Sequence, residues 1–167
     1  LKLVVLLIDL ISAFFMGYSK LKIETSAQSK QNLSPFDSLL HMKFEIDGKT
    51  YDFSKGEYLI ALLSFGCEHC IEEASKLNNY LLIESFPSLI ALCLEETSEE
   101  REDFISKVKP EFPIYSLGNK PLFFLSLIDK EPPRLIHIRD GKVLKIWDYN
   151  LPEINELGSY FDSINKS

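Results

Sequence analysis

The hydrophobic positions of the chain first follow a period of two, which is typical of β-strands. Residues 42–46 alternate apolar and polar side chains, Asp47-Gly48 is typical of a hairpin turn, and residues 50–53 continue the alternation. The unbroken apolar run at residues 58–64 is instead typical of a central strand that is buried on both faces. The pattern therefore predicts a small β-hairpin ahead of a larger sheet.

A helix and a second buried strand follow the central strand. Residues 68–82 have a helix-like pattern, and residues 89–94 are again continuously apolar, directly after Pro87 and Ser88. Two buried strands joined by a helix form a crossover unit, which we expect to be parallel and right-handed.

The rest of the chain continues this alternation of helices and strands. Thr97 or Ser98 can cap the next helix, which has acidic side chains in its first turns. The pattern then predicts a short strand, an apolar helix, a hairpin around Asp140-Gly141 and a closing helix, at residues 112–115, 121–128, 134–147 and 152–164. We expect an α/β fold with a central mixed β-sheet flanked by helices and an N-terminal β-hairpin.

The composition sets the size of the folded part and excludes one class of partner. With 167 residues, 46% of them apolar, the chain can form one domain with additional segments. Its net charge of -7 and its lack of a Lys/Arg cluster argue against nucleic acid as a partner, because phosphate binding needs a basic surface.

The first residues of the chain have a membrane-directed pattern. Residues 3–16 are apolar except for Asp9 and Ser12, and lysines lie on both sides. This run is shorter than the roughly 20 apolar residues of a full membrane span. We expect residues 1–20 to be a membrane anchor, a signal segment or the end of a truncated membrane region, with an ordinary buried helix as the alternative. Residues 21–40 would be a polar linker to a domain at residues 41–167 that faces an extracytoplasmic space, such as that of a bacterial envelope.

Two cysteines, Cys67 and Cys70, flank Glu68 and His69 at the predicted junction between strand and helix. Their i, i+3 spacing on a first helical turn brings the two sulfurs close enough to join. The free N–H groups and the positive dipole end of the helix favour thiolate over thiol. Cys67 would therefore attack a partner's disulfide, and Cys70 would release the resulting mixed disulfide.

A Cys-x-x-Cys pair is also half of a zinc site, so metal binding is the main alternative. The other possible ligands fit this poorly. Cys93 lies in an apolar run and is expected to be a buried strand residue, His41 is near the start of the folded part, and His137 is expected on a strand surface. We favour redox chemistry, which needs no metal and no cofactor. A structural zinc site, a redox-inactive domain and a copper carrier that uses His137 remain as alternatives.

The order of hairpin, central strand, Cys-x-x-Cys helix, strand, helix, proline, hairpin and helix resembles the thioredoxin fold over residues 40–164. The resemblance is closest to the membrane-anchored extracytoplasmic TlpA-like branch, related to the AhpC-TSA group. Its markers are Gly56, the cysteine pair, Pro133 and Asp140-Gly141. The resemblance implies a cis-proline facing the sulfurs, assigned to Pro133, with Pro132 as the competing assignment. A proline there leaves an exposed edge on which an extended substrate can pair.

The chain departs from this family near the cysteines. Where the family has Trp or Thr-Trp before the first cysteine and a proline five residues after the second, this chain has Phe65-Gly66 and Ser75. Thioredoxins also carry a buried acid six residues before the first cysteine, which is Ala61 here. The resolving step would therefore use another base or be slower, and Glu68 is the nearest candidate in sequence.

The two residues between the cysteines favour opposite redox roles. His69 resembles the histidine of oxidising disulfide catalysts, whereas Glu68 resembles the glutamate of cytochrome-maturation thiol reductases. An imidazolium at the helix start stabilises the Cys67 thiolate and makes the disulfide more oxidising, while a carboxylate opposes this. We expect a reduction potential between those of the strongest oxidants and the cytosolic reductants.

These inferences converge on a thiol-disulfide oxidoreductase that acts on protein thiols or disulfides outside the cytoplasm and exchanges electrons with a membrane-bound or soluble redox partner. A peroxiredoxin-like enzyme is disfavoured because the chain lacks a Pro-x-x-x-Thr-x-x-Cys run. A non-catalytic binding module of the same fold is the rival of another class. The residues expected to act are the cysteine pair, the two residues between them and a substrate-binding glycine and proline: Cys67, Cys70, Glu68, His69, Gly66 and Pro133.

Overall fold

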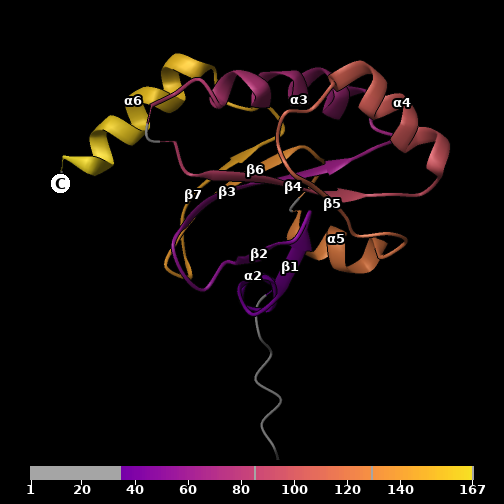
Figure 1. Cartoon of the computed structure of the whole chain (residues 1–167), viewed down its shortest axis with the longest axis horizontal. Helices are drawn as coiled ribbons and strands as arrows, with labels where there is room; N and C mark the ends of the chain where they lie inside the picture. Colours follow the sequence, from indigo (N-terminus) through magenta and orange to yellow (C-terminus); the bar gives the residue numbers. More distant parts are fainter. Residues whose placement is uncertain (1–34, 85, 129, 167) are drawn as a thin grey trace, which may run out of the picture. The chain divides into compact units, whose positions relative to one another are not determined.

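The computed structural model describes residues 35–84, 86–128 and 130–166, which form a five-stranded sheet with covering elements on both faces (Figure 1). In order across the sheet, the strands are β5 (Ile114–Ser116), β4 (Ser88–Leu94), β3 (Glu57–Ser64), β6 (Arg134–Arg139) and β7 (Lys142–Asp148). β3 is parallel to β4 and antiparallel to β6, so the sheet is mixed, as expected.

The two faces of the sheet have different covers, as Figure 1 shows. One face carries three helices, which are α3 (Glu68–Tyr80), α4 (Ser98–Val108) and α6 (Ile154–Asn165). The other face carries two short helices and the predicted hairpin, which are α2 (Pro35–Leu40), α5 (Pro121–Leu127), β1 (Lys43–Ile46) and β2 (Lys49–Asp52). The predicted α/β architecture with an N-terminal β-hairpin is therefore confirmed.

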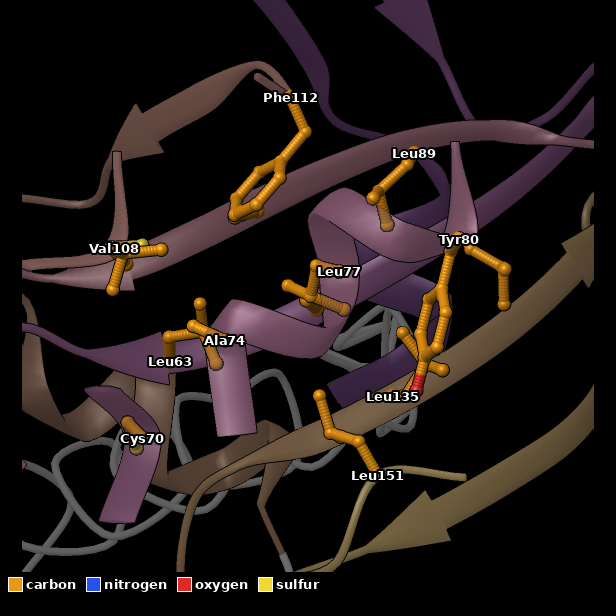
Figure 2. Close-up of a cluster of buried hydrophobic side chains, with 14 of the residues drawn as sticks. Leu63, Cys70, Ala74, Leu77, Tyr80, Leu89, Val108, Phe112, Leu135 and Leu151 are labelled. Carbon is orange, nitrogen blue, oxygen red and sulfur yellow. The ribbon is translucent and has the colours of Figure 1, made fainter. Parts of the chain in front are cut away.

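The side chains of β3 explain why its sequence is continuously apolar. Leu59, Ala61 and Leu63 lie in the hydrophobic cluster beneath the three long helices, part of which is drawn in Figure 2. Ile60 and Leu62 lie in a second cluster, with the hairpin and the short helices. All five side chains are fully buried. Because burial of one large apolar side chain stabilises a fold by about 1.5–3 kcal/mol, this strand anchors both layers.

The folded part begins before residue 41, inside the stretch 21–40 that was expected to be a linker. Residues of α2 form a short helix, and Leu39 is fully buried in the cluster that also contains Phe44 and Leu127. Scattered apolar side chains in a polar stretch give only a weak pattern, and the burial of Leu39 depends on the surface that α5 offers it.

The predicted membrane-directed segment, residues 1–20, and residues 21–34 of the predicted linker lie outside the described residues. Among the helices that the structure does describe, none combines the length and the apolar character needed to cross a membrane.

His137 of β6 is fully buried, so the expectation of a strand surface residue was wrong. Its ring packs edge-on against Phe161 of α6, with 5.1 Å between the ring centroids. Nδ1 is hydrogen-bonded to the Tyr160 hydroxyl at 2.8 Å, and Nε2 to the Glu57 carboxylate at 2.7 Å. The alternation within β6 could not show that α6 covers this face and supplies a polar partner.

Candidate active site at the start of helix α3

Cys67 and Cys70 lie where β3 ends and α3 begins. Cys67 is the N-cap residue of α3, and its Sγ accepts a hydrogen bond from the Cys70 backbone N–H at 3.1 Å. The Phe65 N–H donates to the Leu94 carbonyl at 3.1 Å, which ties the turn to the end of β4. A hydrogen bond from a backbone N–H and the helix N-terminus both stabilise negative charge on a sulfur. The position of Cys67 is therefore suited to a nucleophile.

The two sulfurs of the motif have different surroundings. Cys67 is partly exposed, whereas Cys70 is fully buried beneath the first turn of α3. Burial raises the pKa of the Cys70 thiol, and the neighbouring Cys67 sulfur raises it further. Both are free thiols in this structure. The geometry thus provides one accessible sulfur and one protected sulfur that is three residues away.

The third cysteine is separate from this pair in its surroundings. Cys93 is fully buried in β4, as its apolar neighbours predicted. Burial raises the pKa of its thiol, so Cys93 is disfavoured as a thiolate. Among the described residues, no group of three or more His, Cys, Asp or Glu side chains is arranged to hold a metal ion.

The Pro132–Pro133 peptide bond is cis, as the assignment of Pro133 required. The two prolines have different roles in the structure. Pro133 is buried and its carbonyl accepts a hydrogen bond from the Tyr149 N–H at 2.8 Å, whereas the half-buried Pro132 lines the same pocket as Cys67. The proline loop therefore borders the cysteine site, and Pro132 rather than Pro133 is among the residues that line the pocket.

An open pocket of about 360 Å³ surrounds the accessible sulfur. We call it the Cys67 groove. Its wall combines carboxylates with apolar side chains, and none of the described residues that line it is a Lys or an Arg. The lining residues are Ser64, Gly66, Cys67, His69, Leu94, Glu96, Glu100, Phe124, Leu125, Glu131, Pro132 and Tyr149.

Gly66 allows α4 to approach the cysteine turn closely. A Cβ on Gly66 would lie 2.7 Å from Glu100 Oε1, which is closer than Cβ atoms approach other heavy atoms, so the carboxylate would have to move. Glu100 is held by a capping box, in which its N–H donates to Thr97 Oγ1 at 3.2 Å and its carboxylate accepts from the Thr97 N–H at 3.3 Å. Gly66 thus lines the groove and makes room for a carboxylate next to the site.

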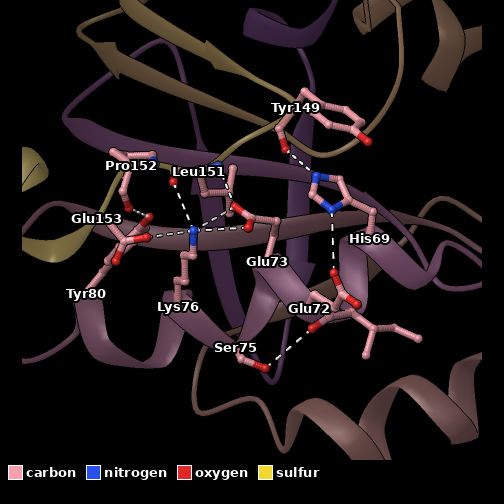
Figure 3. Close-up of polar contacts among 11 residues, drawn as sticks. His69, Glu72, Glu73, Ser75, Lys76, Tyr80, Tyr149, Leu151, Pro152 and Glu153 are labelled. Carbon is pink, nitrogen blue, oxygen red and sulfur yellow. Dashed lines mark hydrogen bonds and ion pairs between the residues drawn. The ribbon is translucent and has the colours of Figure 1, made fainter.

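His69 is held by a residue that comes 80 positions later in the chain. Its Nε2 is 3.0 Å from the Tyr149 carbonyl oxygen, and the two rings stack with their centroids 4.2 Å apart. Nδ1 is 3.8 Å from the Glu72 carboxylate (Figure 3). Glu68, the other residue between the cysteines, is exposed in the first turn of α3. The two predicted tuning residues therefore differ, since one is fixed and the other faces solvent.

Tyr149 and Glu131 were not predicted as parts of the site, and Glu100 is one of the acidic side chains that were expected only in the first turns of a helix. For Glu100 a signal existed, because the capping box Thr97-x-x-Glu100 starts a helix directly after a strand parallel to β3. The carboxyl ends of neighbouring parallel strands meet at one edge of the sheet, which brings α4 beside the cysteines. Tyr149 and Glu131 have no comparable signal in the sequence.

No protein-family model matches the chain, and no curated protein matches it in sequence. Solved structures do resemble it. A secreted disulfide oxidoreductase of Mycobacterium tuberculosis, described as homologous to E. coli DsbE, is 14% identical, with a TM-score of 0.59 over 76% of this chain and 98% of that chain. StoA from Bacillus subtilis is 17% identical, with a TM-score of 0.58 over 72% of this chain and 96% of its own.

A third similar structure is the thioredoxin domain of a thiol-disulfide oxidoreductase from Bacteroides vulgatus. It is 15% identical, with a TM-score of 0.56 over 74% of this chain and 91% of that chain. These similarities show that the chain has the thioredoxin-like fold. They extend over nearly the whole length of each structure compared.

Proposed function

We propose that this thioredoxin-like chain is a thiol-disulfide oxidoreductase that exchanges a Cys67–Cys70 dithiol or disulfide with protein substrates. One observation carries the proposal. Cys67 Sγ is accessible at the N-terminus of α3 and accepts the Cys70 N–H, while Cys70 is buried one turn further into the helix. This arrangement supplies an attacking sulfur and a protected resolving sulfur.

In the reducing direction the reaction has two steps. The Cys67 thiolate attacks one sulfur of a substrate disulfide, so that a mixed disulfide forms, the substrate S–S bond breaks and the other substrate sulfur leaves as a thiolate. Cys70 then attacks Cys67 Sγ, so that the Cys67–Cys70 bond forms and the bound substrate sulfur leaves. The substrate gains two electrons and two protons, and the reverse sequence oxidises a substrate dithiol.

The second step requires that Cys70 lose its proton. Burial raises the pKa of Cys70, and the adjacent Cys67 sulfur adds to this shift. Once Cys67 is part of a mixed disulfide it no longer carries negative charge, which removes the second contribution. The substrate thiolate released in the first step can take the proton. Glu68, the nearest carboxylate to the pair in sequence, is the candidate protein base in this proposal.

The lining of the Cys67 groove favours a substrate segment that is extended, partly apolar and positively charged. Its apolar wall, which includes Phe124, Leu125 and Pro132, suits the side chains of an extended segment around a substrate cysteine. Its carboxylates, Glu96 and Glu131 among them, favour a segment with positive charge. In this proposal Pro133 holds the loop that presents the edge for pairing, and Gly66 lines the groove next to Cys67.

The exchange is proposed to take place outside the cytoplasm, where protein disulfides persist. The membrane-directed pattern of residues 1–20 supports this location. One of the similar structures, 14% identical to this chain, is of a protein described as secreted.

Metal transport is the alternative in which a distant histidine joins the cysteines, and the position of His137 argues against it. His137 pairs with Leu59 near the start of β3, whereas Cys67 follows the other end of that strand. Both of its ring nitrogens have partners, Tyr160 and Glu57. A binding module that never cycles its cysteines is the alternative that the following experiment addresses.

The test is reduction of insulin by the purified chain with dithiothreitol, followed by precipitation of the free insulin B chain. We expect catalysis by the unmodified chain and its abolition by Cys67→Ser. Cys93→Ala is the matched control, because a buried strand cysteine has no access to substrate, and it should retain nearly full turnover. Full activity of folded Cys67→Ser, or equal loss in Cys93→Ala, would contradict the proposal.

A further inference from the structure

The segment that follows β7, residues 149–152, is hydrogen-bonded to one face of α3, and we call it the strap (Figure 3). The Leu151 N–H donates to Glu73 Oε2 at 2.6 Å, and Lys76 Nζ donates to the Leu151 carbonyl at 3.4 Å. The Tyr80 hydroxyl donates to the Pro152 carbonyl. Together with His69, the helix residues that hold the strap are spaced four, three and four positions apart, so they lie on one face of α3.

Tyr149 is the strap residue that joins three parts of the site. Its N–H donates to the Pro133 carbonyl at 2.8 Å, its carbonyl lies 3.0 Å from His69 Nε2, and its ring stacks on the imidazole. The ring is about half exposed and lines the Cys67 groove. Tyr149 therefore connects the proline loop, the residue before Cys70 and the groove wall.

The backbone of Tyr149 is in an unusual conformation that these contacts explain. Its φ of +66° lies in the left-handed region, which residues other than glycine and asparagine rarely adopt. Because a carbonyl oxygen can only accept, the ring nitrogen that faces it must carry the proton. The contact thus selects imidazole with hydrogen on Nε2, and leaves Nδ1 directed towards Glu72 at 3.8 Å.

We infer that Tyr149 is a positioning residue for the disulfide exchange, which acts by holding the His69 imidazole in one orientation and tautomer beside the cysteine pair. This inference rests on the proposed function. Without the ring, the Tyr149 carbonyl still accepts a hydrogen bond from Nε2, but the imidazole loses the aromatic partner that fixes its plane, so the imidazolium form stabilises the Cys67 thiolate less. The Cys67–Cys70 disulfide then becomes less oxidising.

The test is a double-mutant cycle on the redox equilibrium of the full chain with glutathione, using Tyr149→Gly and His69→Ala. Glycine accepts φ +66° without strain, so Tyr149→Gly removes the ring and retains the backbone contacts. We expect it to shift the equilibrium constant towards the disulfide by about threefold to tenfold. In the His69→Ala background the same replacement should change the constant by less than about twofold, because its effect is transmitted through His69.

Two controls separate positioning from general structure. Lys109 is another residue with left-handed φ, at +47°, at the far end of α4, so Lys109→Gly tests the effect of introducing glycine and should leave the equilibrium constant unchanged. Tyr149→Phe keeps the ring and should keep the coupling to His69. ¹⁵N NMR of the imidazole, which does not depend on activity, should show hydrogen on Nε2 in neutral His69.

The outcomes distinguish the inference from the proposed function. Equal shifts by Tyr149→Gly with and without His69, or hydrogen mainly on Nδ1, would overturn the role of Tyr149 and leave the exchange reaction intact. Failure of the unmodified chain to form a Cys67–Cys70 disulfide at any glutathione ratio would overturn both.

Discussion

The carboxylate of Glu100 lies directly against Gly66, the residue before Cys67, so that a Cβ on Gly66 would be 2.7 Å from Glu100 Oε1. Replacement Gly66→Ala should push the carboxylate out of its capping box. We expect the free energy of unfolding, measured in urea, to fall by about 0.5–1.5 kcal/mol, the value of one lost capping hydrogen bond.

The companion variant Glu100→Ala removes the obstacle. Gly66→Ala should therefore lower the free energy of unfolding much less in the Glu100→Ala background than in the unmodified chain. The same cost in both backgrounds would show that the contact between Gly66 and Glu100 does not limit the side chain at position 66.

Cys70→Ala should trap the substrate. Without the resolving thiol, Cys67 remains joined to the substrate in a mixed disulfide that survives non-reducing electrophoresis and is identified by mass spectrometry. The trapped partners should be proteins from outside the cytoplasm. The double variant Cys67→Ser with Cys70→Ala is the control and should trap none. Partners drawn only from the cytoplasm would contradict the proposed location.

Stability should decrease below about pH 6.5, because of His137. Burial lowers the pKa of His137 below its ordinary value of 6.5, and the hydrogen bond to Glu57 offsets this only in part. As the pH falls, the unfolded chain therefore binds a proton before the folded chain does, and the free energy of unfolding decreases. We expect His137→Gln to have a smaller change in urea stability between pH 7.5 and pH 5. The exposed His41 provides the matched control, His41→Gln.

Glu57 affects the stability of the fold at a lower pH than His137 does. Burial alone would raise its pKa, but the hydrogen bonds from Arg139 and His137 outweigh this, and the pKa lies below the ordinary 4.5. Its stabilisation is present above about pH 4.5 and is lost as the pH falls through the folded value.

For His137 the contradicting outcome is as follows. If the free energy of unfolding changed between pH 7.5 and pH 5 by the same amount in His137→Gln as in the unmodified chain, the pH dependence would not come from His137.

The charge of the Cys67 groove should appear in substrate preference. A peptide disulfide with Arg beside its cysteine should be reduced with a kcat/KM about threefold to tenfold higher than the same peptide with Glu, at low salt. The difference should shrink near 1 M salt, where the Debye length falls to about 3 Å. Glu96→Gln should narrow the preference, whereas Glu45→Gln on the exposed hairpin should not. A preference independent of salt would contradict an electrostatic origin.

Local pattern was sufficient for most of the fold. The apolar run at residues 58–64, the following helix and the second buried run predict a parallel crossover unit, because burial on both faces and a helical connection leave few other arrangements. The cysteine pair was found for the same reason, since four adjacent residues carry its chemistry. The start of α4 was also predicted from a cap at Thr97 or Ser98, and Thr97 is the N-cap, because a capping box is local.

Contacts between distant segments were decided only by the tertiary structure. His137 alternates like a surface residue, yet α6 covers it and Glu57 pairs with it across 80 positions. Tyr149 lies in a polar turn that has no hydrophobic periodicity, and only the pairing of β6 with β7 brings it to His69 and Pro133. Periodicity reports which side of an element is apolar. The packing of whole elements against one another determines what each side chain meets, and that depends on residues throughout the chain.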